Sequence, residues 1–505
     1  MEDWSREMEE LRRRERDAEA MGGEHKVARQ RARGKLTARE RIAGVVDDGS
    51  FREIGKIAGQ GHYGEDGELK RLAASNFIFG QARIAGRPVV ATADDFTVRG
   101  GASDAAIYRK FVQAERMAHT LGLPLIRMVD GTGGGGSVKS LEAMGRTYVP
   151  EVPGWEDVVR NLDTVPVVAL SLGPTAGLGA ARVVASHYSV MVKGLSQIFT
   201  AGPPVVAALG EELDKESLGG SDIHTRNGVV DEEAASEAEA FALARRFLSY
   251  LPSKAGEALP VHDIGDPLDR EAESLVAVVP RDPRKVYSMR PVLEAVLDEG
   301  SVFEMGRRWG RGLHTCLARL GGHVVAVMAS DPTSFGGAWT ADTARKAERF
   351  VKLAERFRIP VVNLVDNPGF RVGLEAERAA TIRFGVEAMN AVYRASVPWA
   401  SVIVRRAYGV AAAAMSDASK FQFRAAWPSG DWGSLPMEGG IEVAYQSELR
   451  ASENPEAELA RIKERLGKLA SPFRSAEGFL IEEIIDPRQT RAFLGRFVEA
   501  VVRKT

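Results

Sequence analysis

The stretch ARIAGRPVVATADDFTVRGGA, residues 82–102, decides the fold because the chain carries it twice. Its counterpart is ARLGGHVVAVMASDPTSFGGA, residues 318–338, which aligns without a gap at a constant offset of 236. The same offset then brings Asp130 onto Asp366. Self-similarity at a fixed offset over such a length is typical of a repeated structural unit. The sequence therefore predicts two homologous halves.

Short apolar runs separated by helical stretches surround the first copy of this repeat. The runs are RPVVATA (87–93), LPLIRMVD (123–130), VPVVALSL (165–172) and YSVMV (188–192). Apolar strands that do not alternate with polar residues are typical of a sheet that is buried on both faces. The sequence predicts an α/β fold in which a mostly parallel sheet is covered by helices.

The length of the chain agrees with a division into two domains. Hydrophobic cores stop growing at roughly 250–300 residues, and this chain has 505. The stretch LPSKAGEALPVHDIGDPLDRE, residues 251–271, has the Pro- and Gly-punctuated composition of a linker. We therefore predict domains at residues 1–260 and 261–505.

Charge and composition argue against several classes of partner. The chain has 67 basic and 69 acidic residues, so its net charge of -2 provides no bulk attraction to nucleic acid or to an anionic membrane. No apolar run approaches the ~20 residues that a membrane-spanning helix needs. The single cysteine excludes an intrachain disulfide, and the first 30 residues are charged where a signal peptide would be apolar. We expect a cytoplasmic protein with no nucleic-acid or membrane partner.

A glycine-rich loop, VDGTGGGGSV at 129–138, follows one of the predicted strands, and Gly131, Gly133 and Gly136 spell G-x-G-x-x-G. A dinucleotide site would require this loop to open a helix and lead to a second strand with an acidic residue about 20 positions on. Two prolines and no apolar strand follow instead. We interpret the loop as a tight turn in which Gly133 and Gly134 allow close approach to a ligand. A turn without a ligand is the open alternative.

Small residues recur after equivalent predicted strands of the two halves, in LGPTAGLGAA (172–181) after VPVVALS and in RRAYGVAAAA (405–414) after VPWASVIV. At the start of a helix such residues leave main-chain N–H groups without an internal acceptor, and such amides form oxyanion holes. Close packing of the helix on the sheet would explain the small residues equally well. The candidate positions are Gly177, Leu178 and Gly179 in the first half and Gly409, Val410 and Ala411 in the second.

The chain resembles the carboxyltransferase (beta) subunits of biotin-dependent acyl-CoA carboxylases, such as the propionyl-CoA and methylcrotonyl-CoA carboxylases. The resemblance covers nearly the full length and rests on the order and spacing of many short matches. They include ARGKLTARERI (32–42), SQIFTAGPPVV (196–206), LGGSDIHTRNGVVD (218–231), RKAERFVKLAERFRIPVVNLVDNPGF (345–370) and AYGVA (407–411). The family fold implied is an internally duplicated α/β fold of two crotonase-like (ClpP/crotonase) domains.

The resemblance also implies roles for the candidate residues. The first half would hold the acyl-CoA, and the second would hold the ureido ring of carboxybiotin carried on a separate protein. Amides of Gly177, Leu178 and Gly179 would stabilise the thioester enolate, and those of Val410 and Ala411 the biotin oxyanion. Further positions implied are Ala176, Ala413, Gly133 and Gly134 at the acyl-CoA; Gly409, Pro368, Gly369 and Phe370 at the biotin; and Arg31, Arg33, Lys35 and Arg39 near the CoA phosphates.

Partners and substrate range follow from the same resemblance. The chain contains no A-M-K-M biotinylation motif and no segment like an ATP-using biotin carboxylase, so we expect both on partner subunits. Relatives are usually homohexamers, arranged as a trimer of dimers. Two departures stand out: DGTGGGGS replaces D-S-G-G-A-R, and Leu178 interrupts a Gly-Gly pair. Ala413 stands where relatives commonly carry Asp or a branched aliphatic residue, which predicts a roomier, more apolar acyl pocket.

Two alternatives to acyl-CoA carboxylation remain at this point. The subunit could run in reverse, as part of a biotin-dependent acyl-CoA decarboxylase coupled to a membrane complex, because both directions pass through the same enolate. It could also be a catalytically silent CoA-binding scaffold whose altered loops mark lost activity.

Overall fold

Two compact units make up the chain, residues 1–257 and 258–505, and each is described by itself. The computed structural model describes residues 3–502 except 103, 104, 106, 132–141, 143, 144, 148, 150 and 263. The division lies inside the 251–271 stretch of linker composition. Which substrate each half holds stays a prediction.

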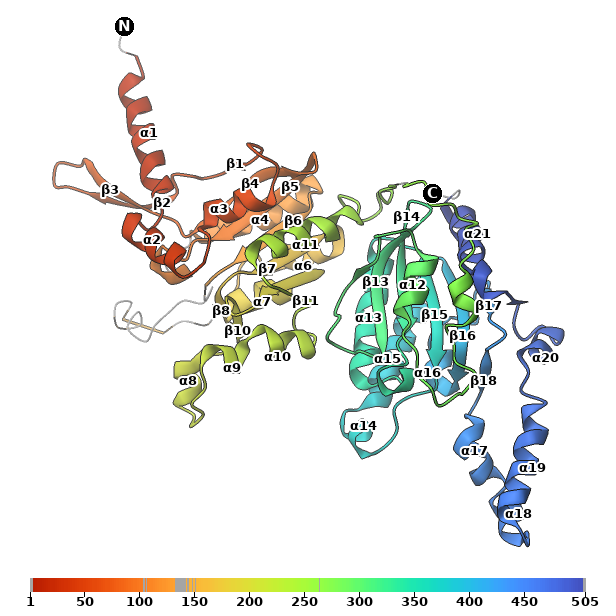
Figure 1. Cartoon of the computed structure of the whole chain (residues 1–505). Helices are drawn as coiled ribbons and strands as arrows, with labels where there is room; N and C mark the ends of the chain where they lie inside the picture. The colour runs from red at the N-terminus through yellow and green to blue at the C-terminus, as the bar shows by residue number, and fades with distance from the viewer. Residues whose placement is uncertain are drawn as a thin grey trace. The chain divides into compact units, whose positions relative to one another are not determined.

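Helices precede the first sheet, and a hairpin lies in the chain between its strands β1 (Arg52–Glu53) and β4 (Phe77–Ile84) (Figure 1). The helices are α1 (Ser5–Glu19), α2 (Glu24–Ala32) and α3 (Ala38–Val45), and the hairpin strands are β2 (Gly59–Tyr63) and β3 (Leu69–Ala74). A capping box starts α3: the Thr37 hydroxyl accepts from the amide of Glu40, and the Glu40 carboxylate accepts from the amide of Thr37. This cap sets where the turn between α2 and α3 ends. We call residues 31–41 the arm.

The sheet of the first unit has the strand order β1-β4-β5-β6-β7-β9-β11. Its strands are β1 (Arg52–Glu53), β4 (Phe77–Ile84), β5 (Arg87–Asp94), β6 (Leu125–Val129), β7 (Val167–Ser171), β9 (Tyr188–Val192) and β11 (Glu232–Ala234). Pairing is antiparallel from β1 to β5 and parallel from β5 to β11. The four predicted strands and the mostly parallel sheet are therefore confirmed.

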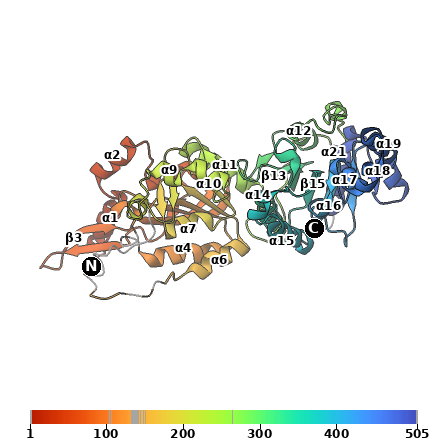
Figure 2. The ribbon, with the colours of Figure 1, turned by 90° about the horizontal axis from the view of Figure 1, so that it is seen from below.

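Helices cover both faces of this sheet. On one face α4 (Tyr108–Leu121) and α6 (Trp155–Thr164) lie side by side, as Figure 2 shows. They bury Phe111 and Val158 against Val90 and Leu125 of the sheet. On the other face α11 (Glu237–Ser249) packs on α3 and β9. The shorter elements are η1 (Arg99–Gly101), β8 (Pro174–Ala176), α7 (Leu178–Val184), β10 (Gln197–Phe199), α8 (Pro203–Ala207), α9 (Lys215–Gly219) and α10 (Ser221–Arg226).

The second unit repeats this order, with strands β12-β13-β14-β15-β16-β17-β19 and β18 paired to β16. The strands are β12 (Phe303–Glu304), β13 (Leu313–Leu320), β14 (His323–Ser330), β15 (Val361–Asn367), β16 (Trp399–Tyr408), β17 (Phe423–Ala426), β18 (Asp431–Gly433) and β19 (Glu483–Ile484). Pairing again changes from antiparallel to parallel at the third strand, β14. Two copies of one topology follow directly from the repeat in the sequence.

Some helices of the second unit lie around its sheet, whereas those between residues 437 and 467 stand away from it (Figure 1). They are α12 (Arg290–Val296), α13 (Ala341–Arg356), α14 (Leu374–Arg378), α15 (Thr381–Arg394), α16 (Gly409–Ala413), α17 (Met437–Ala444), α18 (Gln446–Ala451), α19 (Pro455–Gly467), α20 (Pro472–Glu477) and α21 (Thr490–Val502), with 3-10 turns η3 (Glu273–Val276), η4 (Phe335–Gly337) and η5 (Pro487–Gln489). The hydrophobic core of the second unit includes Trp427, Phe493 and Phe497. Across the described residues of both units, no helix is long and apolar enough to cross a membrane.

Candidate active site

The first candidate loop lies where β8 ends and α7 begins. Gly177 precedes the helix with φ 56° and ψ -122°, a conformation that only glycine adopts without strain. Its own amide donates to the carbonyl of Phe199 at 3.4 Å. The next amides, of Leu178 and Gly179, belong to the first helical turn, and within the described part of the chain they have no acceptor. Leu178 and Gly179 are therefore the open donors, and Gly177 shapes the turn.

The second candidate loop occupies the equivalent place after β16. Gly409 has φ 62° and opens α16, a helix of five residues. The amides of Val410 and Ala411 lie in its first turn, and no acceptor for them occurs among the residues that the structure describes. Val410 is half exposed, whereas Ala411 is buried. The second loop thus presents the same kind of donor pair as the first.

A buried arginine holds the far end of α7. Arg127 of β6 donates to the carbonyls of Arg182 and Ala185, at 3.2 and 2.5 Å, where the helix ends. Its guanidinium is paired at 2.7 Å with Glu115 of α4. Arg182 in turn pairs with Asp94 at 3.1 Å. These contacts fix α7 against two strands and one helix, and so fix the direction of its first amides.

The second unit uses Asn363 at the position that the 236-residue offset equates with Arg127. Its side-chain amide donates to the carbonyl of Met415 at 2.9 Å, just beyond the end of α16. One strand position therefore anchors the candidate helix in both units. The repeat aligns Arg127 with Asn363, but the two residues differ in size and charge, so the sequence did not single out either of them.

Pro368, Gly369 and Phe370 follow β15 and lie at the same edge of the sheet as the second loop. The Asn367 side chain accepts from the amide of Gly369 at 2.9 Å. A Cβ placed on Gly369 would stand 3.9 Å from the carbonyl of Tyr408, directly before α16. The structure therefore brings Gly369 and Gly409 together, as expected for residues that line one side of a site.

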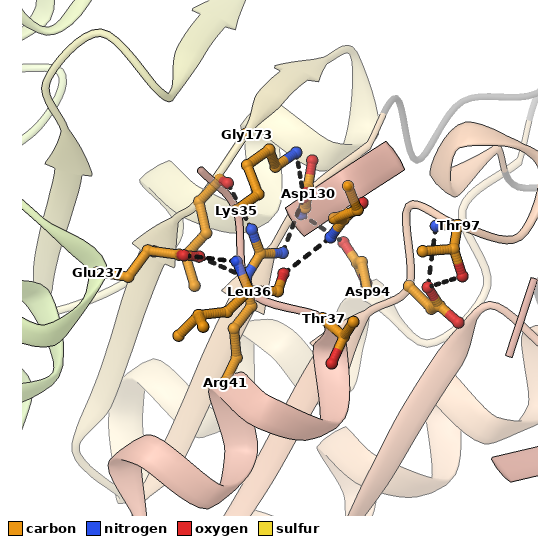
Figure 3. A network of polar contacts seen from close by, with 12 residues as sticks. Lys35, Leu36, Thr37, Arg41, Asp94, Thr97, Asp130, Gly173 and Glu237 are labelled. Atoms are coloured by element: carbon orange, nitrogen blue, oxygen red, sulfur yellow. Dashed lines mark hydrogen bonds and ion pairs between the residues drawn. The ribbon is translucent and has the colours of Figure 1, made fainter. Parts of the chain in front are cut away.

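A buried ion network lies beside Gly173, four residues before Gly177 (Figure 3). Asp130, at the end of β6, is paired with Lys35 at 2.5 Å and with Arg41 at 2.8 Å. Arg41 also binds Glu237 at 2.6 Å and the carbonyl of Leu172 at 2.7 Å. The network therefore ties the arm to β6, to α11 and to the chain that leads from β7 to Gly177.

Burial dominates the electrostatics of this network. It lowers the pKa of Lys35, and the Asp130 carboxylate beside it opposes that shift. Burial also acts against the charge of Arg41, but the Asp130 and Glu237 carboxylates outweigh it and raise the Arg41 pKa. Within the described residues, the second carboxylate oxygen of Asp130, Oδ1, has no hydrogen-bond partner.

The basic residues expected near the CoA phosphates occupy different environments. Lys35 is only 7% exposed and its charge is taken up by Asp130, so it does not lie on the surface with the other basic residues. Arg39 is paired at 2.6 Å with Glu53, and Arg31 at 2.6 Å with Glu40. Arg33 is exposed. Burial alone separates Lys35 from its neighbours, and nothing in the spacing of the arm signals that difference.

Other expected site residues are distributed as follows. Ala176 ends β8, directly before the first loop, and Ala413 is exposed at the end of α16. Gly133 and Gly134 lie outside the described residues. The two candidate loops belong to different units, so their meeting in one cleft stays a prediction.

Comparison with known proteins agrees with these features. Residues 29–505 match the family described as carboxyl transferase domain. The chain is 32% identical to the propionyl-CoA carboxylase carboxyltransferase subunit of Haloferax mediterranei, over 96% of this chain and 94% of that one. It is also 32% identical to the methylmalonyl-CoA decarboxylase subunit alpha of Veillonella parvula, over 94% of this chain and 91% of that one.

A solved structure is similar over the whole chain. It is the hexameric transcarboxylase 12S with methylmalonyl-coenzyme A and methylmalonic acid bound, and it matches with a TM-score of 0.88 at 29% identity. The match covers 100% of this chain and 96% of the other.

Proposed function

Since the chain belongs to the carboxyl transferase family and is the carboxyltransferase component of an acyl-CoA carboxylase, we propose that its carboxyl donor is carboxybiotin on a partner protein and that main-chain amides carry the chemistry. The two units would be crotonase-like domains in tandem, the first for acyl-CoA and the second for biotin. The observation that carries the proposal is the pair of equivalent loops, each with open amides at a helix start.

The first loop would stabilise the thioester enolate. The amides of Leu178 and Gly179 point from the start of α7, and they are the donors that an enolate oxygen would accept from. A preorganised donor of this type contributes about 3–4 kcal/mol to transition-state stabilisation. Gly177 supplies the sharp turn and not the donor, because its amide is bound to Phe199.

The second loop would stabilise negative charge on the ureido oxygen of biotin through Val410 and Ala411, next to Pro368, Gly369 and Phe370. Carboxybiotin held there would supply both the carboxyl group and the base for the α-proton of the acyl-CoA. Neither 176–180 nor 409–413 contains a titratable side chain, which fits a reaction that draws its base from the donor. The protein then orients both partners and holds the charge of each.

Arg31 and Arg33 are the arm residues we propose for the CoA phosphates, because both side chains are exposed. Ala413 would border the acyl chain. Its methyl group leaves more apolar space than the Asp or branched aliphatic residue usual in relatives, so substrates with longer acyl chains would fit.

A reconstituted assay tests the proposal. The chain is combined with a biotin carboxylase, a biotinylated carrier, ATP and bicarbonate, and an acyl-CoA panel is scored for carboxylation. We expect turnover that requires the biotinylated carrier and falls about 10²–10³-fold when the first loop is distorted. Turnover of no thioester, with CoA binding retained, would favour the scaffold alternative.

The Ala413→Asp variant tests the acyl pocket in the same assay. We expect the preference to move toward shorter acyl chains, with Ala412→Asp as the matched control one residue away. An unchanged preference would contradict the assignment of Ala413.

The similarity to the methylmalonyl-CoA decarboxylase subunit favours a second candidate, the reverse reaction. Release of carbon dioxide from methylmalonyl-CoA in the presence of unloaded biotinylated carrier would support it.

A homohexamer is also part of the proposal, with each site shared by two subunits. Light scattering would then give a mass about six times the 54.7 kDa of one chain.

A further inference from the structure

Gly173 and Arg405 occupy equivalent places in the two units. Ser171 pairs with Val129 across the first sheet, and Ile403 pairs with Val365 across the second. The offset of 236 relates Val129 to Val365, and an offset of 232, which also relates Gly177 to Gly409, relates Ser171 to Ile403. Gly173 lies two residues after Ser171, and Arg405 lies two residues after Ile403. Gly173 and Arg405 are therefore equivalent positions.

Asp130 and Asp366 are the equivalent carboxylates one residue beyond these pairs. Both are fully buried. A buried carboxylate stays charged only when cations or hydrogen bonds compensate it. Each unit must therefore deliver positive charge to the same point of its sheet.

The second unit delivers this charge from the neighbouring strand. Arg405 and Arg406 bind Asp366 through their Nε atoms at 2.9 and 2.7 Å. Both arginines belong to β16, which runs unbroken from Trp399 to Tyr408.

The first unit delivers the charge from the arm. Asp130 is bound by Lys35 and Arg41, 95 and 89 residues away in the sequence. The corresponding strand is interrupted here, since β7 ends at Ser171 and β8 starts at Pro174. The arm therefore enters where the sheet of the first unit is broken.

Gly173 provides the space for this arrangement. A Cβ at this position would overlap Asp130 Oδ1 and Lys35 Nζ. The backbone of Gly173 does not require glycine, because its φ is not positive. Because residue 173 has no side chain, the Lys35 ammonium can occupy the space beside Asp130.

We propose that Lys35 replaces, from the arm, the cation that Arg405 supplies from the strand, and that it acts as a positioning residue for the first loop. Lys35 and Arg41 hold Asp130, and Arg41 holds the carbonyl of Leu172, five residues before Gly177. Docking of the arm is then what sets the path of residues 172–177. The catalytic part of this inference rests on the proposed function, because it takes the first loop as the enolate site.

A transplant of the second unit's arrangement tests the proposal. The variants are Lys35→Ala, Gly173→Arg and the double variant, with Lys26→Ala on the exposed face of α2 as control. Kinetic constants are measured for an acyl-CoA and for the corresponding acyl-pantetheine, which lacks the nucleotide phosphates.

We expect each single variant to lower kcat, on the order of 10²-fold, because the loop is displaced. The effect of Lys35→Ala should be equal for both substrates. In the double variant the Asp130 carboxylate still has to rotate away from the new Cβ, but the overlap with Lys35 is gone and the introduced guanidinium takes the place that the ammonium left. The loss should therefore be smaller than the product of the two single losses, and kcat should recover about tenfold over Gly173→Arg. A double variant whose loss of kcat equals the product of the two single losses would overturn the proposal. An effect of Lys35→Ala that is confined to the KM of the full CoA ester would also overturn it.

Hydrogen exchange provides a readout that does not depend on turnover. Amides of residues 172–180 should exchange faster in both single variants and return toward the wild-type rate in the double variant. Unchanged exchange in Lys35→Ala would overturn the positioning role. A wild-type protein without transfer activity would instead refute the proposed function, while the exchange data still decide whether Lys35 positions the loop.

Discussion

Replacing Arg41 with methionine is expected to destabilise the first unit more than replacing any exposed arginine of the arm. Arg41 is fully buried, and its three nitrogens each bind a different acceptor: Glu237, Asp130 and the carbonyl of Leu172. Methionine has a similar length but no donor. Both carboxylates would then lose a cation in an environment that excludes water.

The magnitude follows from the partners that remain. Removing one member of a buried ion pair costs about 3–5 kcal/mol. Asp130 keeps Lys35, and Glu237 keeps the amide of Leu36 at 2.8 Å, so we expect the lower part of this range. For a unit of this size each kcal/mol lowers Tm by about 2–4 °C. The predicted loss is roughly 6–12 °C, measured by calorimetry of the full chain.

A matched control separates burial from ion pairing. Arg31 makes an equally short bond, 2.6 Å to Glu40, but its side chain is 59% exposed. Exposed pairs contribute at most about 1 kcal/mol, so Arg31→Met should change Tm little. Hydrogen exchange would locate the loss in Arg41→Met at residues 165–180. Equal Tm values for the two variants would refute the reasoning.

Three further predictions concern the loops and a buried lysine. Gly177→Ala should lower kcat with little change in the KM for acyl-CoA, since alanine is strained by about 1–3 kcal/mol at this φ and ψ; an unchanged kcat in steady-state kinetics would contradict it. Asn363→Leu leaves the carbonyl of Met415 without its donor and should lower the free energy of unfolding by about 1–3 kcal/mol in urea titrations, whereas equal midpoints would show that the bond contributes nothing. Burial lowers the pKa of Lys110 to about 8 from 10.5, so the folded state loses its proton first and stability should rise as pH increases between these values. Lys110→Met should flatten that rise, and a slope identical to that of the wild type would exclude Lys110 as its source.

Much of the fold was predictable because its signals are local or repeated. Strands β5, β6, β7 and β9 appear as apolar runs without alternation, which directly reports burial on both faces. The duplicated topology was visible as a constant offset between 82–102 and 318–338. The positions of the two loops followed from small residues at the ends of equivalent strands.

Within the candidate site, the sequence did not determine which main-chain amides are free or which side chains hold the ends of the two helices. Whether the amide of Gly177 or that of Leu178 is free depends on the carbonyl of Phe199, which a separate strand brings to Gly177. Arg127 and Asn363 differ in size and charge, so similarity of residue type did not single them out. Their shared role is visible only once α7 and α16 lie on their sheets.

The sequence by itself determined the α/β class, the duplication and the places where open amides occur, because backbone periodicity and glycine tolerance are properties of neighbouring residues. Only the tertiary structure decided what the charges of the arm do. Arg33 and Lys35 are two residues apart and equally basic, yet one is exposed and the other is buried against a carboxylate 95 residues away. The role of a charge depends on the water and counter-charges around it, and folding alone brings those together.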